Sequence, residues 1–244
     1  SSDIGAFVSI ADKLDTICGC FGVGLIPSGT ADPYALRRSA IGIIAIILDR
    51  GYDLSLAELV DESLALLGGK LTRDAETVRG EVLEFFRGRY VNLLAARYPA
   101  DAVEAAVAAS FDNLNDTAAR IAALAEFKER PDFEPLAVAF KRVCNIVKQG
   151  IETPVDATLL QEEAERELYR MFDAVSTVAR EQIAAKNYLA ALTEIAGLRG
   201  AVDAFFDQVM VMAEDDRIKN NRLALLTGIA RLFGAIADFA RISA

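Results

Sequence analysis

A glycine-rich segment from Gly19 to Arg38 is the first place where this sequence could carry chemistry, because glycine-rich loops cradle phosphate groups. A Walker loop also needs a lysine, in the pattern GxxxxGK followed by Ser or Thr. A dinucleotide-binding loop places GxGxxG between a strand and a helix. The segment has neither the lysine nor a preceding strand pattern. We interpret it as a structural turn between two helices, the second capped by Asp32 with Pro33 at its first position.

Acidic residues form two further candidates, for magnesium binding or for acid–base catalysis. Asp12 and Asp15 lie one turn apart on the first expected helix, and residues 214–216 (Glu-Asp-Asp) stand at a corner between helices. Histidine is absent, which excludes Ser-His-Asp and Cys-His catalysis on this chain. No partner base accompanies either acidic group. The corner is therefore expected to cap the last helix, through Asp215 or Asp216.

Basic residues gather in three clusters whose side chains could contact nucleic-acid phosphates and base edges. On their own, such clusters are more often the solvated faces of helices. In the second cluster, three side chains at i, i+4 and i+7 share one helix face. The clusters are Arg37 with Arg38; Lys141, Arg142, Asn145 and Lys148; and Arg217, Lys219, Asn220, Asn221 and Arg222.

The composition is that of a folded protein in which 53% of the 244 residues are hydrophobic and 25% are charged. The net charge is −10, so any nucleic acid must bind through local basic patches. Three cysteines suggest free thiols in a reducing compartment rather than a disulfide framework or a zinc site. The longest apolar run, residues 40–48, is about half of the roughly 18 residues that a membrane span requires.

Apolar residues recur at helical spacing almost throughout, which predicts an all-α protein. Capping boxes are expected at residues 55–58 and 158–161, and the longest loop is expected at residues 150–158. Short connections predict that the chain ends in an antiparallel bundle, in which Phe205 and Phe206 belong to an apolar stripe. Its three long helices are expected at about 158–185, 187–212 and 216–241.

Three long stretches of the sequence resemble the bacterial glycyl-tRNA synthetase β subunit. They are ADKLDTICGCFGVGLIPSGTADPYALRRSAIGII (11–44), FKRVCNIVK (140–148) and the segment from YLAALTEIAGLRGAVDAFFDQVMVMAEDD to FARI (188–242). Together the resemblance extends over nearly the whole chain. Two departures stand out: SGTADPY replaces TGSxDPF, and Phe140 stands where asparagine is commoner in the family.

The resemblance implies a helical segment from the end of the β-subunit body at 1–71. A helical region at 72–244 follows and ends in a DALR-like anticodon-binding bundle at about 134–244. Asp12 resembles the final aspartate of an HD-type fold, although the His-Asp pair of such folds is absent here. No catalytic residue, metal or cofactor is expected on this chain, because ATP, Mg²⁺ and glycine belong to a separate α subunit in that family.

The partners implied are tRNA(Gly) and the α subunit, in a cytoplasmic α2β2 heterotetramer, with no DNA and no membrane. The function implied is tRNA recognition in support of glycine attachment. The alternative is a helical assembly module that does not touch the anticodon, and Arg222 could equally pair with Glu214 or Asp215. The expected RNA-binding residues are Lys141, Arg142, Asn145, Lys148, Arg217, Lys219, Asn221 and Arg222.

Overall fold

The computed structural model describes residues 2–131, 133–147 and 150–243. Within these ranges the regular structure is helical, and extended pairing is limited to two isolated bridges, Ser28 with Ala31 and Ser55 with Asn113. The all-α fold expected from the sequence is confirmed. No helix in the described part of the chain is both long and apolar enough to cross a membrane.

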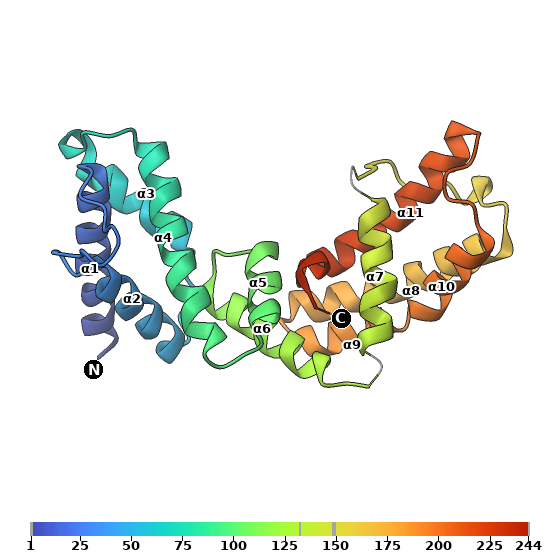
Figure 1. The fold of residues 1–244 in the computed structure, drawn as a ribbon, viewed down its shortest axis with the longest axis horizontal. Coiled ribbons are helices and arrows are strands. Elements are labelled where there is room, and N and C mark those ends of the chain that lie inside the picture. Colours follow the sequence, from blue (N-terminus) through green and yellow to red (C-terminus); the bar gives the residue numbers. More distant parts are fainter. Residues whose placement is uncertain (1, 132, 148–149, 244) are drawn as a thin grey trace. The chain divides into compact units, whose positions relative to one another are not determined.

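The chain forms two compact units, which Figure 1 shows in blue to green and in green to red. The first runs to Arg97 and includes Phe111–Ala118; the second consists of Tyr98–Ser110 and the chain from Ala119 onward. The division therefore falls inside one helix, α6 (Leu114–Lys128). The domain boundary expected between residues 71 and 72 lies within the first unit. That this boundary separates the end of the β-subunit body from the following helical region stays a prediction.

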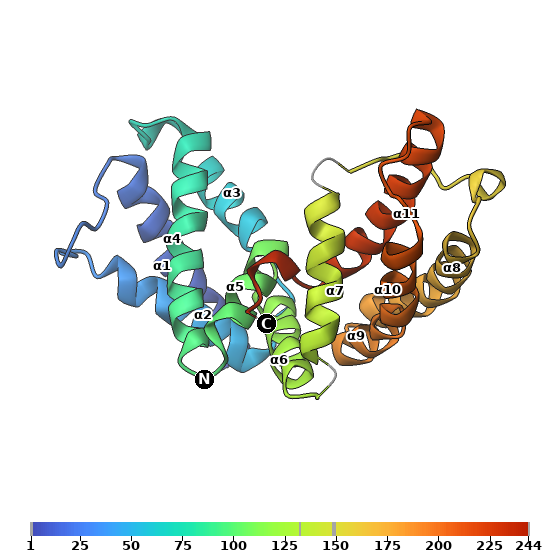
Figure 2. The same cartoon turned by 45° about the vertical axis from the view of Figure 1, so that its right-hand side comes forward.

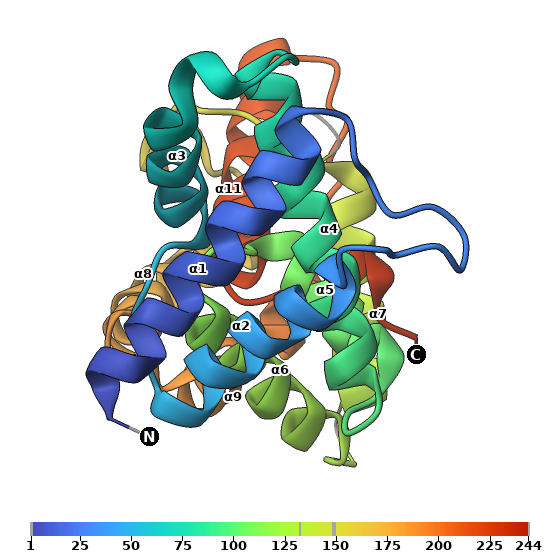
Figure 3. The same ribbon diagram turned by 90° about the vertical axis from the view of Figure 1, so that its left-hand side faces the viewer.

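In the first unit, α1 packs against the three other long helices, as Figure 3 shows from the side of α1. Its buried stripe includes Ile10, Leu14 and Ile17, which recur at the spacing of one helix face. The connection from α3 to α4 contains a short 3₁₀ turn, η1 (Gly68–Lys70). The long helices are α1 (Asp3–Gly22), α2 (Leu36–Arg50), α3 (Leu56–Leu67) and α4 (Ala75–Ala95).

The ends of these helices follow from local side-chain chemistry. The Ser55 hydroxyl accepts a hydrogen bond from the Glu58 amide at 3.1 Å, which confirms the expected N-cap of α3. Asp32 also caps a helix, but α2 begins later than the sequence pattern predicts. The Asp32 carboxylate accepts from the amides of Leu36 and Arg37 at 2.8 and 3.0 Å, so α2 begins three residues after Pro33.

The second unit is a helical bundle in which α7 packs against α10 and α11, while α8 packs against α9, α10 and α11 (Figure 2). A 3₁₀ turn near the C-terminus, η3 (Phe239–Arg241), packs against α5 and α7. Another short turn, η2 (Ala157–Leu159), precedes α8. The helices are α5 (Ala100–Ala109), α7 (Phe133–Ile146), α8 (Glu163–Ala184), α9 (Tyr188–Ala196), α10 (Arg199–Gln208) and α11 (Asp216–Gly234).

Aromatic side chains join α7, α11 and η3 in the core of this bundle. The Phe140 ring centroid lies 3.5 Å from that of Phe233 and 5.8 Å from that of Phe239, and all three residues are buried. Aromatic pairs of this kind add to the stabilisation from burial alone. Phe140, the position at which asparagine is commoner in the family, thus serves the core in this chain.

Three further helix boundaries differ from the sequence-based expectation. The capping box predicted at residues 158–161 is wrong, because α8 begins at Glu163 and its capping box pairs Glu162 with Glu165. The single helix predicted at 187–212 is also wrong, because it is two helices that meet at Gly197 and Leu198. The last helix is shorter than expected and ends at Gly234, with η3 beyond it.

Candidate nucleic-acid interface

Three of the expected RNA-contacting residues lie on α7. Arg142 and Asn145 are exposed and Lys141 is half-buried, while the opposite face of the helix is in the core. The Arg142 guanidinium lies 4.3 Å from the ring centroid of Phe206 on α10, a cation–π contact. In the described part of the chain, neither Lys141 nor Arg142 forms an ion pair with a carboxylate. Lys148 lies outside the described residues.

The cation–π contact gives Arg142 a defined position without neutralising its charge. The sequence pattern predicted that Phe205 and Phe206 both lie in the core. Phe205 is fully buried, whereas Phe206 is half-buried. A guanidinium that rests on an aromatic ring keeps its N–H groups free at the edge of the plane. The α7 residues thus present two unneutralised cations and one amide to solvent, a combination suited to phosphates and base edges.

Arg222 of the third cluster has a different environment, since its side chain is only 6% exposed. Its Nε donates to Oε1 of Glu165 on α8, and its Nη1 donates at 2.9 Å to the carbonyl oxygen of Met210. The pairing of Arg222 with Glu214 or Asp215, considered from the sequence, is therefore wrong. Glu165 lies far away in sequence and becomes a neighbour only when α8 packs against α11.

Asn221 is also buried and joins α11 to the loop before α8. Its Nδ2 donates to the carbonyl oxygen of Asp156 at 3.0 Å, and its Oδ1 accepts from the Asp156 amide at 2.7 Å. Both polar ends of the amide are therefore occupied by one backbone segment. The roles in RNA contact expected for Asn221 and Arg222 are not compatible with this burial, and both side chains stabilise the bundle instead.

Glu165 is the centre of this arrangement, which we call the Glu165–Arg222 clasp: Glu165, Arg222, Asn221 and the backbone groups that they bind. Its Oε2 also accepts from the amides of Gln161 and Glu162, at 2.6 and 2.8 Å. Burial alone raises the pKa of this carboxyl. The hydrogen bonds from Arg222 and from the two amides outweigh that effect and hold the pKa below its ordinary value.

The remaining residues of the third cluster lie at the first turns of α11. Arg217 is exposed, and Lys219 is half-exposed and pairs with the exposed carboxylate of Asp216. Asp215 is the N-cap of α11 and accepts from the Arg217 amide at 2.8 Å, which confirms one of the two expected caps. Of the cations in this cluster, Arg217 and Lys219 thus remain accessible to a polyanion.

The glycine-rich segment forms a structural turn, as expected. Arg37, from the first basic cluster, folds back over it and donates to the carbonyl oxygen of Gly29 at 2.8 Å. Gly22 ends α1 against the segment before α4, where a Cβ would overlap the Leu71 side chain. The amides of Thr72 and Arg73 donate to the Gly22 carbonyl. The close approach of backbone to side chain explains the glycine at this position.

The acidic and thiol candidates lack the geometry of a reactive site. Asp12 and Asp15 are exposed on α1, and no three acidic or cysteine side chains in the described ranges lie close enough to hold a metal ion. The cysteines are free. Burial raises the pKa of the Cys18 thiol to about 11, so it stays protonated and unreactive near neutral pH.

Sequence reasoning missed three residues that the fold makes important. Glu165 has a recognisable signal, because it is the third residue of α8 and can reach back to the amides before the helix. Arg180 and Arg231 have none, since each is an isolated arginine outside the basic clusters. The packing of α8 against α11 brings both to the rim of one pocket.

The second unit corresponds to a known class of domain. Residues 136–243 match the model of the DALR anticodon binding domain, and they extend from α7 to the end of the described chain. The bundle that contains both the α7 cations and the Glu165–Arg222 clasp is therefore a DALR-type bundle.

Residues 1–108 match the model of the glycyl-tRNA synthetase β subunit. The glycine–tRNA ligase β subunit of Geobacter metallireducens is 68% identical over 244 residues, which are 100% of this chain and 36% of the relative. That of Geobacter sulfurreducens is 69% identical over 205 residues, 84% of this chain and 30% of the relative. That of Syntrophotalea carbinolica is 56% identical over 243 residues, 99% of this chain and 35% of the relative.

These matches identify the chain as homologous to the C-terminal region of glycyl-tRNA synthetase β subunits, with a DALR anticodon-binding domain. The chain spans about a third of the length of these curated relatives.

Proposed function

We propose that this chain is the tRNA-binding portion of a glycyl-tRNA synthetase β subunit, and that its bundle recognises the anticodon region of tRNA(Gly). The match of residues 136–243 to the DALR anticodon binding domain carries this proposal. The exposed cations of that bundle support it: Lys141, Arg142, Arg217 and Lys219 hold phosphates. Asn145, exposed on the same helix as Arg142, reads base edges.

The acidic balance of the chain makes these local cations decisive. With a net charge of −10, the molecule as a whole repels RNA, and only a local patch can attract it. Lys141, Arg142 and Arg217 contribute most to such a patch, because none of them forms an ion pair with a carboxylate in the described ranges. Lys219 contributes less, since Asp216 lies beside it.

The names of the relatives, which are glycine–tRNA ligase β subunits, support a proposal for the whole enzyme. In it, a separate α subunit binds ATP, Mg²⁺ and glycine and attaches the glycine, in a cytoplasmic α2β2 assembly. This chain contributes tRNA binding and no catalytic group.

Binding of tRNA(Gly) and of an unrelated tRNA, measured by fluorescence anisotropy at low and at physiological salt, tests the role in tRNA recognition. We expect preference for tRNA(Gly) and an affinity that falls steeply with salt, because phosphate contacts release counterions. Replacement of both Lys141 and Arg142 by alanine removes two contacts. The slope of log affinity against log salt is then expected to fall by roughly one to two.

The double variant Lys70→Ala/Arg87→Ala is the matched control, because it removes one lysine and one arginine from the first unit. Circular dichroism confirms that each variant is folded. Equal binding of the two tRNAs, or equal loss of affinity in both double variants, contradicts specific recognition by the α7 residues.

A second role, as a helical assembly surface, is favoured by an exposed apolar face on the first unit. Ile4, Phe7 and Val8 of α1 and Leu66 of α3 are between 47% and 81% exposed, beside a groove of about 420 Å³ between these helices. Its partner in this proposal is an apolar segment of the larger part of the relatives' β subunit that this chain does not span. Such docking is expected to resist salt, and Val8→Glu is expected to abolish co-purification of the two parts.

A further inference from the structure

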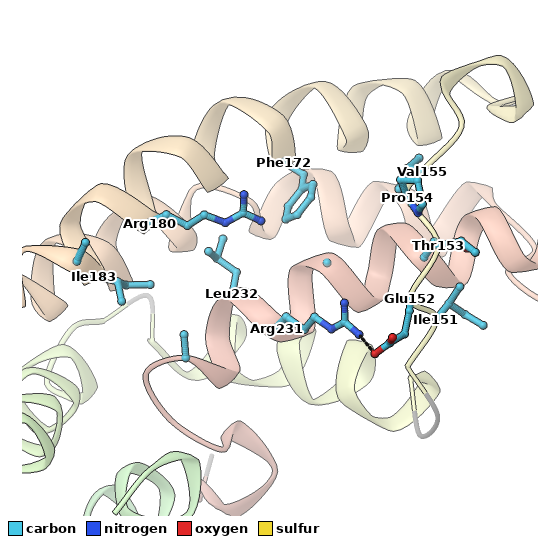
Figure 4. A pocket seen from close by; sticks show the side chains of 14 residues that line it. Ile151, Glu152, Thr153, Pro154, Val155, Phe172, Arg180, Ile183, Arg231 and Leu232 are labelled. Carbon is cyan, nitrogen blue, oxygen red and sulfur yellow. Dashed lines mark hydrogen bonds and ion pairs between the residues drawn. The ribbon is translucent and has the colours of Figure 1, made fainter. Parts of the chain in front are cut away.

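A pocket of about 430 Å³ opens between α8, α11 and the loop at residues 151–155, within the second unit. Figure 4 shows Phe172 and Arg180 pointing from α8 into the space above α11, with Leu232 below them and Arg231 turned toward Glu152 of the loop. Its volume is within the range of pockets that hold small ligands. None of these residues belongs to the predicted RNA-binding set.

The shape of the pocket depends on a glycine beneath the aromatic ring. Gly228 of α11 lines the pocket, and a Cβ there would lie 2.8 Å from Cζ of Phe172. The missing side chain lets the Phe172 ring lie directly against α11. The loop is fixed on the opposite side, where the Ile151 amide donates to the Thr227 hydroxyl at 3.2 Å. The pocket is therefore formed by contacts of α11 with α8 on one side and with the loop on the other.

The charges at the pocket favour an anionic ligand. Arg180 is exposed and forms no hydrogen bond or ion pair in the described part of the chain. Arg231 pairs with Glu152 at 3.2 Å, and both side chains are more than half exposed, so solvent weakens the pair. Two arginines and one glutamate leave the pocket with one excess positive charge.

We propose that this pocket binds a single unstacked nucleotide from the loop of the bound RNA. The base lies against Phe172 and Leu232, Arg180 and Arg231 hold its phosphates, and the Glu152 carboxylate accepts from an exocyclic amine of the base. This inference rests on the proposed tRNA binding and assigns it a second contact site, separate from the α7 cations.

The combination of side chains selects a nucleotide over other ligands of similar size. Unpaired bases are recognised in proteins by stacking on aromatic rings and guanidinium planes, with hydrogen bonds to their edges. A purely apolar ligand would give the Arg180 guanidinium neither a hydrogen-bond acceptor nor a negative charge. An inorganic anion would leave the Phe172, Leu232 and Ile183 surfaces exposed to water. A nucleotide matches both the arginines and the apolar surfaces, because it joins a planar base to a phosphate.

The test uses a 17-nucleotide RNA hairpin with a seven-nucleotide loop, in which 2-aminopurine replaces each loop base in turn. The fluorescence of this probe reports whether the base is stacked. We expect one loop position to change its fluorescence on binding to the wild-type chain. Arg180→Ala and Phe172→Leu are expected to lose that change and to bind the hairpin about tenfold more weakly.

Arg170→Ala is the matched control, because Arg170 lies on the same helix, is exposed and does not line the pocket. It is expected to bind as the wild type does. A hairpin with the same stem and a stable four-nucleotide loop is expected to bind without the fluorescence change.

The outcomes separate this inference from the proposed function. If the wild-type chain binds the hairpin and Arg180→Ala and Phe172→Leu bind it equally well, the pocket assignment is overturned while tRNA binding stands. If the wild-type chain binds no hairpin, both are overturned. If the free 2-aminopurine ribonucleotide binds as tightly as the hairpin and depends on Arg180, the pocket serves free nucleotides and the inference is wrong.

Discussion

The two basic clusters of the bundle have similar compositions, but their side chains lie in different environments. On α7, Lys141, Arg142 and Asn145 keep their polar groups accessible to solvent, and Arg142 rests on an aromatic ring. On α11, Asn221 and Arg222 are buried in the Glu165–Arg222 clasp. The difference shows that the role of an arginine depends on what packs opposite its helix face. Basic composition alone does not distinguish a ligand-binding patch from an internal brace.

The largest effect is expected on removal of the buried cation. Arg222→Ala leaves the Glu165 carboxylate buried without its partner, so the free energy of unfolding should fall by about 3–5 kcal/mol. Urea denaturation measures this, with Arg166→Ala as control, because Arg166 pairs with Glu163 in an exposed position. The control should lose less than about 1 kcal/mol. A loss of the same small size in Arg222→Ala would erase the distinction between the clusters.

A smaller loss is expected at Asn221. Asn221→Ala leaves the amide and carbonyl of Asp156 without their partners, which should cost about 1–3 kcal/mol of unfolding free energy. Asn145→Ala is the control on α7, because Asn145 is exposed, and it should change stability by less than about 0.5 kcal/mol. Equal destabilisation by both substitutions would mean that burial does not separate the two asparagines.

Arg142→Ala should have the opposite effect to Arg222→Ala, with a small loss of stability and a clear loss of RNA affinity. It removes one cation–π contact, so stability should fall by only about 0.5–1 kcal/mol. RNA affinity should fall at every salt concentration, with the larger ratio at low salt. Thermal denaturation and anisotropy titration of the same preparation measure the two quantities. A large loss of stability with unchanged RNA affinity would place Arg142 with the structural residues.

The smallest effect is a dependence of stability on pH. The native fold lowers the pKa of Glu165, so its contribution is complete above the ordinary carboxyl pKa near 4.5. That contribution is lost as the pH falls through the lower native value. Unfolding of the wild type between pH 3 and 6 should therefore show a steeper acid loss than Glu165→Gln, which cannot take up that proton. Coincident slopes for the two proteins would show that Glu165 does not titrate differently in the folded state.

The local features of the chain were largely predictable. Ser55 and Asp215 cap helices where their side chains and the following residues indicated, because a cap is a bond between atoms a few residues apart. Boundaries failed where packing intervened. The predicted box at residues 158–161 was replaced by one centred on Glu165, whose side chain also meets Arg222. The helix predicted through Gly197 divides there into α9 and α10.

The candidate site was less predictable than the helices. The resemblance to the β-subunit family identified the α7 and α11 segments, and the DALR match agrees with that assignment. The pocket between α8 and α11 had no signal, because Phe172, Arg180 and Arg231 are far apart in sequence and belong to no motif.

The sequence by itself determined the all-α class, the structural nature of the glycine-rich turn, the absence of histidine chemistry and the family. Each depends on composition, on short-range spacing or on long similar stretches. Only the tertiary structure decided which cations are available to a ligand. Burial of Arg222 requires Glu165 from another helix, and exposure of Arg142 requires that Phe206 support it without covering it. Whether a charge faces solvent depends on contacts between segments distant in the chain.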